Sequence, residues 1–123
     1  MSVSPDSLIG RTLDGRYRIE SIAARGGMAT VYLGHDRLLD RPVDVKVLFP
    51  EYAREPSFVE RFRREAQAAA NLNRHPNIVS IYDFGQEQGT YFIVMEYVDG
   101  QSLRELIQRE GTIPPQRAAA IVA

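Results

Sequence analysis

The stretch Val43-Asp44-Val45-Lys46-Val47-Leu48 alternates valines with other side chains. A period of two in β-branched residues is typical of a β-strand. Lys46 is the only lysine of the chain, because all other basic residues except the two histidines are arginines. An ammonium group inside an otherwise apolar strand is costly to bury without a partner, so Lys46 is the first candidate for a functional side chain.

Two stretches before this strand also predict β-structure. Residues 17–22 alternate in polarity from Tyr17 onward, and residues 30–33 are β-branched or aromatic. Gly26 and Gly27 lie between them and predict a turn. Three strands joined by short links predict an antiparallel meander. A glycine turn lets backbone N–H groups approach phosphate oxygens closely, although most such turns only reverse the chain.

A helix is predicted after Pro56. Ser57 and Glu60 have the spacing of a capping box, in which Ser57 caps the first turn and Glu60 reaches back. The helix is expected to end near residues 71–74. One stripe at helical spacing runs along it and consists of Phe58, Phe62, Glu65, Ala66 and Ala69.

Glu65 is the charged member of this stripe. A buried carboxylate without a partner costs several kcal/mol, so we expect Glu65 to pair with Lys46. An equally open alternative is that the stripe is slightly rotated. Glu65 would then be solvated and paired with Arg61 and Arg64 of the same helix.

The rest of the chain predicts two more strands and two short helices. Residues 78–82 indicate a fourth strand, residues 86–90 a polar turn and residues 91–95 a buried fifth strand. A capping box at residues 102–105 opens a short helix, and a pair of prolines begins a last one. Residues 118–123 are apolar and lack a capping signal, so we expect the chain to be cut inside that helix.

Composition narrows the function classes. The chain has 123 residues, 44% apolar and 25% charged, which is ordinary for a globular protein. A net charge of -1 argues against a nucleic-acid binder. The absence of cysteine excludes disulfides and thiolate sites, and two histidines are too few for a histidine-built metal site. Neither an apolar span nor a signal peptide is seen, so a cytoplasmic location is expected.

The order of these features matches a known arrangement: a glycine hairpin, a lysine on the third strand, and a glutamate on the following helix. In this order the chain resembles the N-terminal lobe of a bacterial Hanks-type (eukaryotic-like) serine/threonine protein kinase. The resemblance covers roughly residues 13–123 and rests on five blocks at family spacing. These blocks are ARGGMATVY (24–32), VDVKVL (43–48), RFRREA (61–66), HPNIV (75–79) and IVMEYVDG (93–100).

The resemblance implies an α+β fold, with a five-stranded antiparallel sheet, one long helix, a hinge and the first helices of a truncated C-lobe. Residues 1–15 would be a leader, residues 16–98 the kinase N-lobe, and residues 99–123 the hinge exit and the start of the C-lobe.

The resemblance also implies the site. Lys46 and Glu65 would be the catalytic ion pair, with Lys46 on the α- and β-phosphates of ATP. Met95 would be the gatekeeper, and backbone groups of Glu96 and Val98 would hold the adenine edge. The full nucleotide-binding set would be Ala24, Arg25, Gly26, Gly27, Met28, Ala29, Val31, Lys46, Met95, Glu96 and Val98.

The expected ligands and partners follow from the family. They are ATP, protein substrates and a second N-lobe in a back-to-back homodimer, with no nucleic acid. Mg²⁺ is expected only with the missing C-lobe, and a membrane anchor would lie in a segment not present here.

Three positions depart from the family's pattern. The family has glycine where Ala24 and Ala29 stand, and a small apolar residue where Asp44 stands. Ala24 puts a methyl group where the loop needs a permissive backbone. Asp44 would lie on the same face of its strand as Lys46, about 7 Å away, draw the ammonium from Glu65 and oppose the entry of adenine. The alternative is that Asp44 turns to solvent and ATP still binds.

Asp83-Phe84-Gly85 spells the metal-binding triplet of kinases but precedes the linker at residues 96–99, whereas the family places the triplet after it. The chain contains no His-Arg-Asp sequence. We therefore expect no metal site, and Asp83 is predicted to end the fourth strand at a turn.

Three functions remain open. The chain is the ATP-binding lobe of an active kinase, inactive by itself because the catalytic loop is missing. Alternatively, it is a pseudokinase or regulatory interaction module, with Ala24 and Asp44 marking weakened nucleotide binding. A third alternative is a truncated product without function, whose apolar end promotes association.

Overall fold

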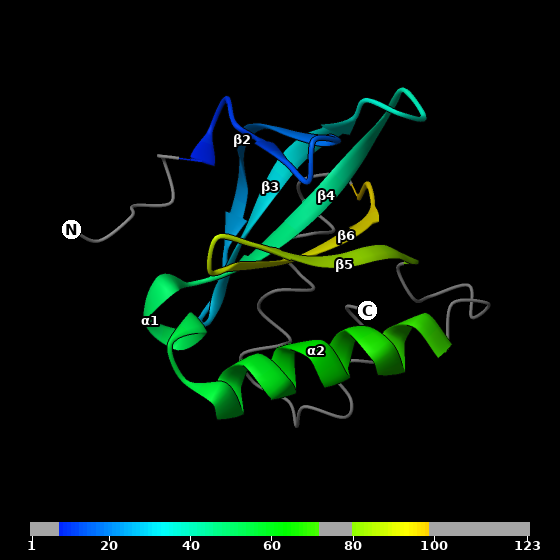
Figure 1. Ribbon diagram of the computed structural model, residues 1–123. Helices are drawn as coiled ribbons and strands as arrows, with labels where there is room; N and C mark the ends of the chain where they lie inside the picture. The colour runs from blue at the N-terminus through cyan, green and yellow to red at the C-terminus, as the bar shows by residue number, and fades with distance from the viewer. Residues whose placement is uncertain (1–7, 72–79, 99–123) are drawn as a thin grey trace.

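The computed structural model describes residues 8–71 and 80–98. Predictions for residues 1–7, 72–79 and 99–123 lie outside this part, including both C-terminal helices and the HPNIV block. The elements are β1 (Thr12–Leu13), β2 (Tyr17–Arg25), β3 (Ala29–Asp36), β4 (Arg41–Leu48), α1 (Pro50–Ala53), α2 (Pro56–Asn71), β5 (Ile81–Glu87) and β6 (Thr90–Glu96) (Figure 1).

The strands form one antiparallel sheet in the order β1-β2-β3-β4-β6-β5. The meander β2-β3-β4 and the addition of β6 and β5 confirm the predicted kind of sheet. The difference is a sixth strand, β1, which pairs with the start of β2. Leu8 and Leu13 are buried in the main core cluster, so residues from Leu8 onward pack on the sheet within the expected leader. A strand of two residues, Thr12–Leu13, is too short to show a period of two.

β4 is buried on both faces, and its alternation separates two sets of side chains. Val43, Val45 and Val47 join the main core cluster, together with Tyr17 and Phe92. Asp44, Lys46 and Leu48 therefore project to the other face, because successive strand residues point in opposite directions.

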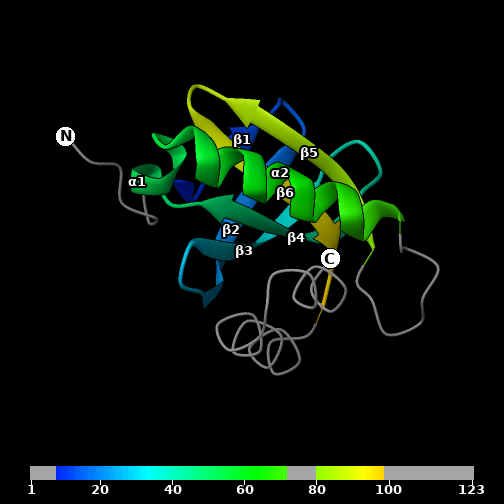
Figure 2. The ribbon, with the colours of Figure 1, turned by 90° about the horizontal axis from the view of Figure 1, so that it is seen from below.

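Helix α2 covers this second face. Phe62 and Ala66 are buried and pack in one cluster with Leu48 of β4 and Ile93 of β6. Figure 2 shows α2 lying across the sheet on this side, with its axis along β5. The helical stripe predicted from the sequence is confirmed at Phe62 and Ala66, which supply the apolar contact that holds the helix on the sheet.

The start of α2 differs from the prediction. The helix begins at Pro56, and the carbonyl of Glu55 accepts the N–H groups of Phe58 and Val59. Ser57 thus lies inside the first turn. Glu60 contacts Arg63 and Arg64 instead of reaching back. The capping-box prediction was wrong because a proline suits the first helical position, where its missing N–H costs nothing.

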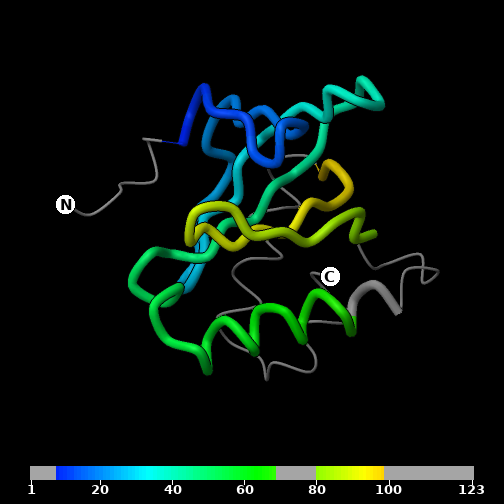
Figure 3. Tube along the Cα trace, viewed as in Figure 1, coloured from blue at the N-terminus to red at the C-terminus, as the bar shows by residue number. Residues whose placement is uncertain are grey.

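The chain reaches α2 from β4 through a short connection, which can be followed along the trace in Figure 3. It passes through α1, a single turn that the sequence analysis missed, directly into α2. Within the described residues, no helix has the length and apolar character needed to cross a membrane.

β5 is placed further along the chain than predicted. It runs from Ile81 to Glu87, so Asp83 lies within the strand and does not end it. Gly85 lets the strand pass close to the ring of Phe92, because the Cβ of any other residue at this position would lie only 2.5 Å from that ring. The turn to β6 is only Gln88-Gly89, both with positive φ, which fits the two-residue hairpin that favours glycine. β6 is buried as predicted.

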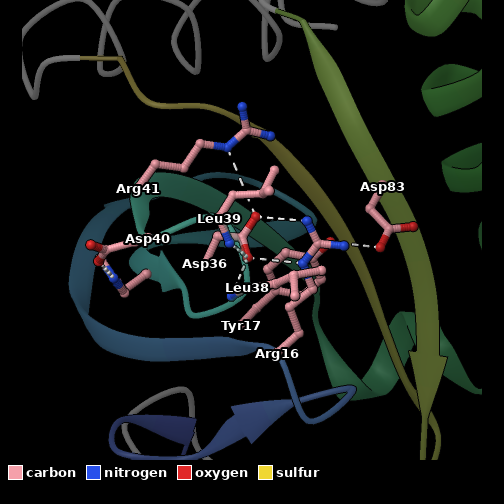
Figure 4. A network of polar contacts seen from close by, with 9 residues as sticks. Arg16, Tyr17, Asp36, Leu38, Leu39, Asp40, Arg41 and Asp83 are labelled. Carbon is pink, nitrogen blue, oxygen red and sulfur yellow. Dashed lines mark hydrogen bonds and ion pairs between the residues drawn. The ribbon is translucent and has the colours of Figure 1, made fainter.

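Polar contacts tie the start of β2, with the arginine that precedes it, to β3 and to β5 (Figure 4). Arg16 donates two hydrogen bonds of 2.8 Å to Asp36, whose carboxylate also accepts the N–H groups of Leu38 and Leu39. Asp36 is only 1% exposed. The Arg16 guanidinium holds the pKa of Asp36 well below its ordinary value, so this carboxylate remains charged.

Asp83 belongs to the same region. The hydroxyl of Tyr17 donates a hydrogen bond of 2.7 Å to Asp83, linking β2 to β5. Burial, followed by this bond, raises the pKa of Tyr17. Asp83 therefore has a structural role, because it accepts the hydrogen bond that ties β5 to β2.

Asp36→Ala should lower the free energy of unfolding by about 1–3 kcal/mol, because it removes a hydrogen-bonded carboxylate and leaves Arg16 without its partner. The pKa of Asp36 is lowered on folding, so its contribution is present above the ordinary aspartate pKa of 3.8 and is lost as the pH falls below it. Urea unfolding at neutral and acidic pH measures both effects. Asp40→Asn, at an exposed carboxylate of the β3–β4 turn, is the control, and equal stability of the two variants at neutral pH would contradict the prediction.

Candidate functional site

The candidate site lies on the face of the sheet that α2 covers, around Lys46. In the register of the sheet, Lys46 stands between Val31 of β3 and Ile93 of β6. Directly opposite residues of paired strands project to the same face. Val31 packs with Met95, whereas Ile93 packs with α2. Lys46 thus sits on the border between an apolar group and the helix.

Glu65 lies on α2 between two residues that contact the sheet, Phe62 and Ala66. Its side chain is 25% exposed, and its Oε1 is 3.7 Å from Nε of Arg61. Arg64 contacts Glu60. Lys46 and Glu65 therefore belong to the same side of the sheet, as their pairing requires. The pairing itself stays a prediction.

The glycine hairpin joins β2 to β3 beside this face. The N–H of Gly26 donates to the carbonyl of Ala29 at 2.8 Å, and the carbonyl of Met28 accepts the N–H of Phe49 at 2.8 Å. A Cβ added at Gly27 would meet nothing within 4 Å. The hairpin is thus held at its base, while the backbone at Gly27 is open to a ligand.

Ala24 does not disturb this hairpin. It lies in β2 opposite Val31 and packs against the cluster of Val31 and Met95. Its methyl group is accommodated as an ordinary strand side chain.

An apolar group lies next to Lys46 on the same face of the sheet. Val31 and Met95 form its buried core, and Ala23, Ala24, Ile81 and Val98 pack against them. Ala23 and Ile81 were missed by the sequence analysis. The sequence predicts a strand at Ile81 but not the place of that strand in the sheet. The contact of Ile81 with the apolar group follows from its pairing with Met95.

The last residue of β6 and the segment after it carry the two backbone groups that were predicted to hold the adenine edge. The N–H of Glu96 donates to the carbonyl of Ser80 at 2.9 Å, and Oε1 of Glu96 accepts the N–H of Ser80 at 3.2 Å. The N–H of Val98 donates to Oδ2 of Asp44 at 2.8 Å. Both N–H groups are therefore bonded within the chain.

Asp44 is fully buried, with 0% of its surface exposed. The expectation that it turns to solvent was wrong, because Met95 and Leu33 flank it in the sheet and Val98 closes over it. Burial raises the pKa of Asp44 to about 6, and the hydrogen bond from Val98 partly opposes this shift. Its Oδ1 has no hydrogen-bond partner. Asp44 thus bonds the chain after β6 through its Oδ2.

These observations test whether a nucleotide fits. The open backbone at Gly27 and the position of Lys46 suit phosphate groups. The base of a nucleotide does not fit in this conformation, because the Val98 N–H that would bind it already donates to Asp44. In the described part of the chain, no three histidine, aspartate or glutamate side chains gather as metal ligands.

Comparison with known proteins gives a consistent result. Residues 17–123 match the family described as protein kinase domain. The chain is 51% identical over 115 residues to serine/threonine-protein kinase PrkC of Bacillus subtilis, covering 94% of this chain and 18% of that protein. It is 49% identical over 115 residues to serine/threonine-protein kinase PknB of Mycobacterium tuberculosis, covering 90% and 18%.

A solved structure agrees with the fold. The crystal structure of a double mutant of the Mycobacterium tuberculosis PknI kinase domain has a TM-score of 0.64 and 33% identity to this chain. The likeness covers 80% of this chain and 37% of the solved one. The chain thus spans less than a fifth of the length of the two similar kinases named above.

Asp44→Asn should stabilise the 123-residue chain at about pH 7.5 by about 1–3 kcal/mol relative to wild type. Because folding raises the pKa of Asp44, its favourable contribution is complete below 3.8 and is lost as the pH rises through about 6. Asparagine has no such titration and keeps an acceptor for Val98. Urea unfolding between about pH 4 and about pH 7.5 tests this, and a wild-type minus variant difference that does not change with pH would contradict it.

Proposed function

The chain belongs to the protein kinase family, as its resemblance to the N-lobe of bacterial serine/threonine kinases indicated, and from this premise we propose that it is the ATP-binding lobe of such a kinase. In the full catalytic domain this lobe would hold ATP while the γ-phosphate passes to a serine or threonine of a protein. The observation that carries the proposal is the position of Lys46, on the α2 face of the sheet and between the glycine hairpin and the apolar group of Val31 and Met95.

Each end of this arrangement suits one part of ATP. Backbone N–H groups of the hairpin and the Lys46 ammonium are donors for phosphate oxygens. Val31 and Met95 offer apolar surface for a flat ring. Glu65 would fix the ammonium so that it does not follow the mobile phosphates, and it would do so from a helix that can move.

The lobe alone is proposed to be inactive in phosphoryl transfer. Its sequence has no His-Arg-Asp loop, and its one Asp-Phe-Gly triplet has a structural partner in Tyr17. The catalytic base and the Mg²⁺ ligands would come from the C-lobe of the family, which supplies the in-line geometry for the transfer.

A second function is favoured by one observation, the buried carboxylate of Asp44 on the Val98 N–H. A lobe that holds its own hinge in this way could serve as a pseudokinase or a regulatory interaction module. The two functions differ in nucleotide affinity, which the experiments below measure.

Protein substrates, a cytoplasmic location of the lobe and a back-to-back homodimer are proposed from the family. The β3–β4 turn offers apolar surface for self-association, because Leu38 and Leu39 are 70% and 55% exposed.

Lys46→Met should weaken ADP binding about ten-fold or more, because it removes the ammonium that contacts the phosphates. The affinity is measured by calorimetry in two backgrounds, the wild-type chain and the Asp44→Ala chain. Arg37→Met, which removes an exposed cation of the β3–β4 turn, is the matched control and should bind like its parent. The proposed function is wrong if ADP binds in the Asp44→Ala background with the same affinity whether or not Lys46 is present, or does not bind at all.

A further inference from the structure

We propose that Asp44 is an internal ligand of the adenine subsite, occupying the Val98 N–H so that a purine base binds only after this carboxylate has left. The inference rests on the proposed function and adds a residue that sets nucleotide affinity. Asp44 would make the closed subsite the resting state of the lobe.

The hydrogen bond is the first observation. Asp44 lies in β4 directly opposite Met95 of β6, and Val98 follows three residues after Met95. The chain after β6 brings the Val98 N–H to 2.8 Å from Oδ2 of Asp44. A charged acceptor at this distance makes one of the stronger hydrogen bonds in proteins, so a neutral ring nitrogen competes poorly for the same donor.

Burial is the second observation. Asp44 is 0% exposed, and Val31 and Met95 are 1% and 2% exposed. The side chains that would contact a base therefore contact one another and the chain itself. A flat ring cannot enter between them until Asp44 or its neighbours move, because protein interiors are closely packed.

The third observation is that only one of the two carboxylate oxygens of Asp44 has a hydrogen-bond partner. Oδ2 has Val98, whereas Oδ1 is buried without a hydrogen-bond partner. A buried acceptor without a donor is destabilising, so the closed state is held by one strong bond and weakened at the other oxygen. This balance allows the carboxylate to leave when a ligand supplies better contacts.

The neighbouring strand positions argue against a purely structural role. The sheet is complete without the Asp44 side chain, because β4 keeps its backbone pairs with β3 and β6. Alanine would leave the Val98 N–H facing the apolar group, available to a base. Removing Asp44 should therefore open the subsite without unfolding the lobe.

The test uses adenosine, which has no phosphates and reports on the base subsite alone. Calorimetry compares the wild-type chain with Asp44→Ala, Asp44→Asn and the exposed control Asp40→Asn. Asp44→Ala should bind adenosine about ten-fold to one-hundred-fold more tightly than wild type. Asp44→Asn should gain less, because its amide oxygen still accepts from Val98, and Asp40→Asn should match wild type.

An independent readout is the backbone amide of Val98 in the absence of nucleotide, followed by NMR. Its hydrogen exchange should be slow in wild type and fast in Asp44→Ala. Equal adenosine affinity in wild type and Asp44→Ala, or an unprotected Val98 amide in wild type, would overturn the inference while leaving the proposed function intact. A protected amide with no adenosine or ADP binding in any variant would overturn the proposed function, and this inference with it.

Discussion

The central constraint is that β4 is buried on both faces and still carries two ionisable side chains. The valines of β4 pack in the main core on one face of the sheet. Asp44 and Lys46 must therefore project to the opposite face, which α2 covers. Both charges need partners there, because ionised groups are costly to remove from water. The N–H of Val98 is the partner of Asp44, and Glu65 of α2 lies on the same side of the sheet as Lys46.

Lys46 and Asp44 lie in different surroundings. Lys46 stands at the border between α2 and the apolar group, where in the proposed site it would bind phosphates beside the glycine hairpin. Asp44 stands one step further from the helix and bonds to the backbone of Val98. In the proposed site, the same strand would present a donor for the phosphate end of a nucleotide and an acceptor that closes the base end.

The sequence was sufficient for most of the sheet and for the long helix, because these rest on periods that are local and repeated. Five blocks in their order were sufficient for the family. The sequence failed where one particular contact, and not a repeated period, decides the structure. The start of α2 depends on Glu55 and Pro56 rather than on the capping box, and the placement of β5 depends on the ring of Phe92 over Gly85. The bond between Asp44 and Val98 was missed for the same reason, since fifty-four positions separate them in the chain.

The most direct measurement of the central claim uses the fact that Lys46 is the only lysine. In a chain with isotope-labelled lysine, its side-chain ammonium gives a single NMR signal that needs no assignment. The account predicts that Glu65→Gln shifts this signal and that ADP shifts it again in the Asp44→Ala chain. A signal that neither the substitution nor the nucleotide changes would contradict the claim that this face of the sheet is a nucleotide site.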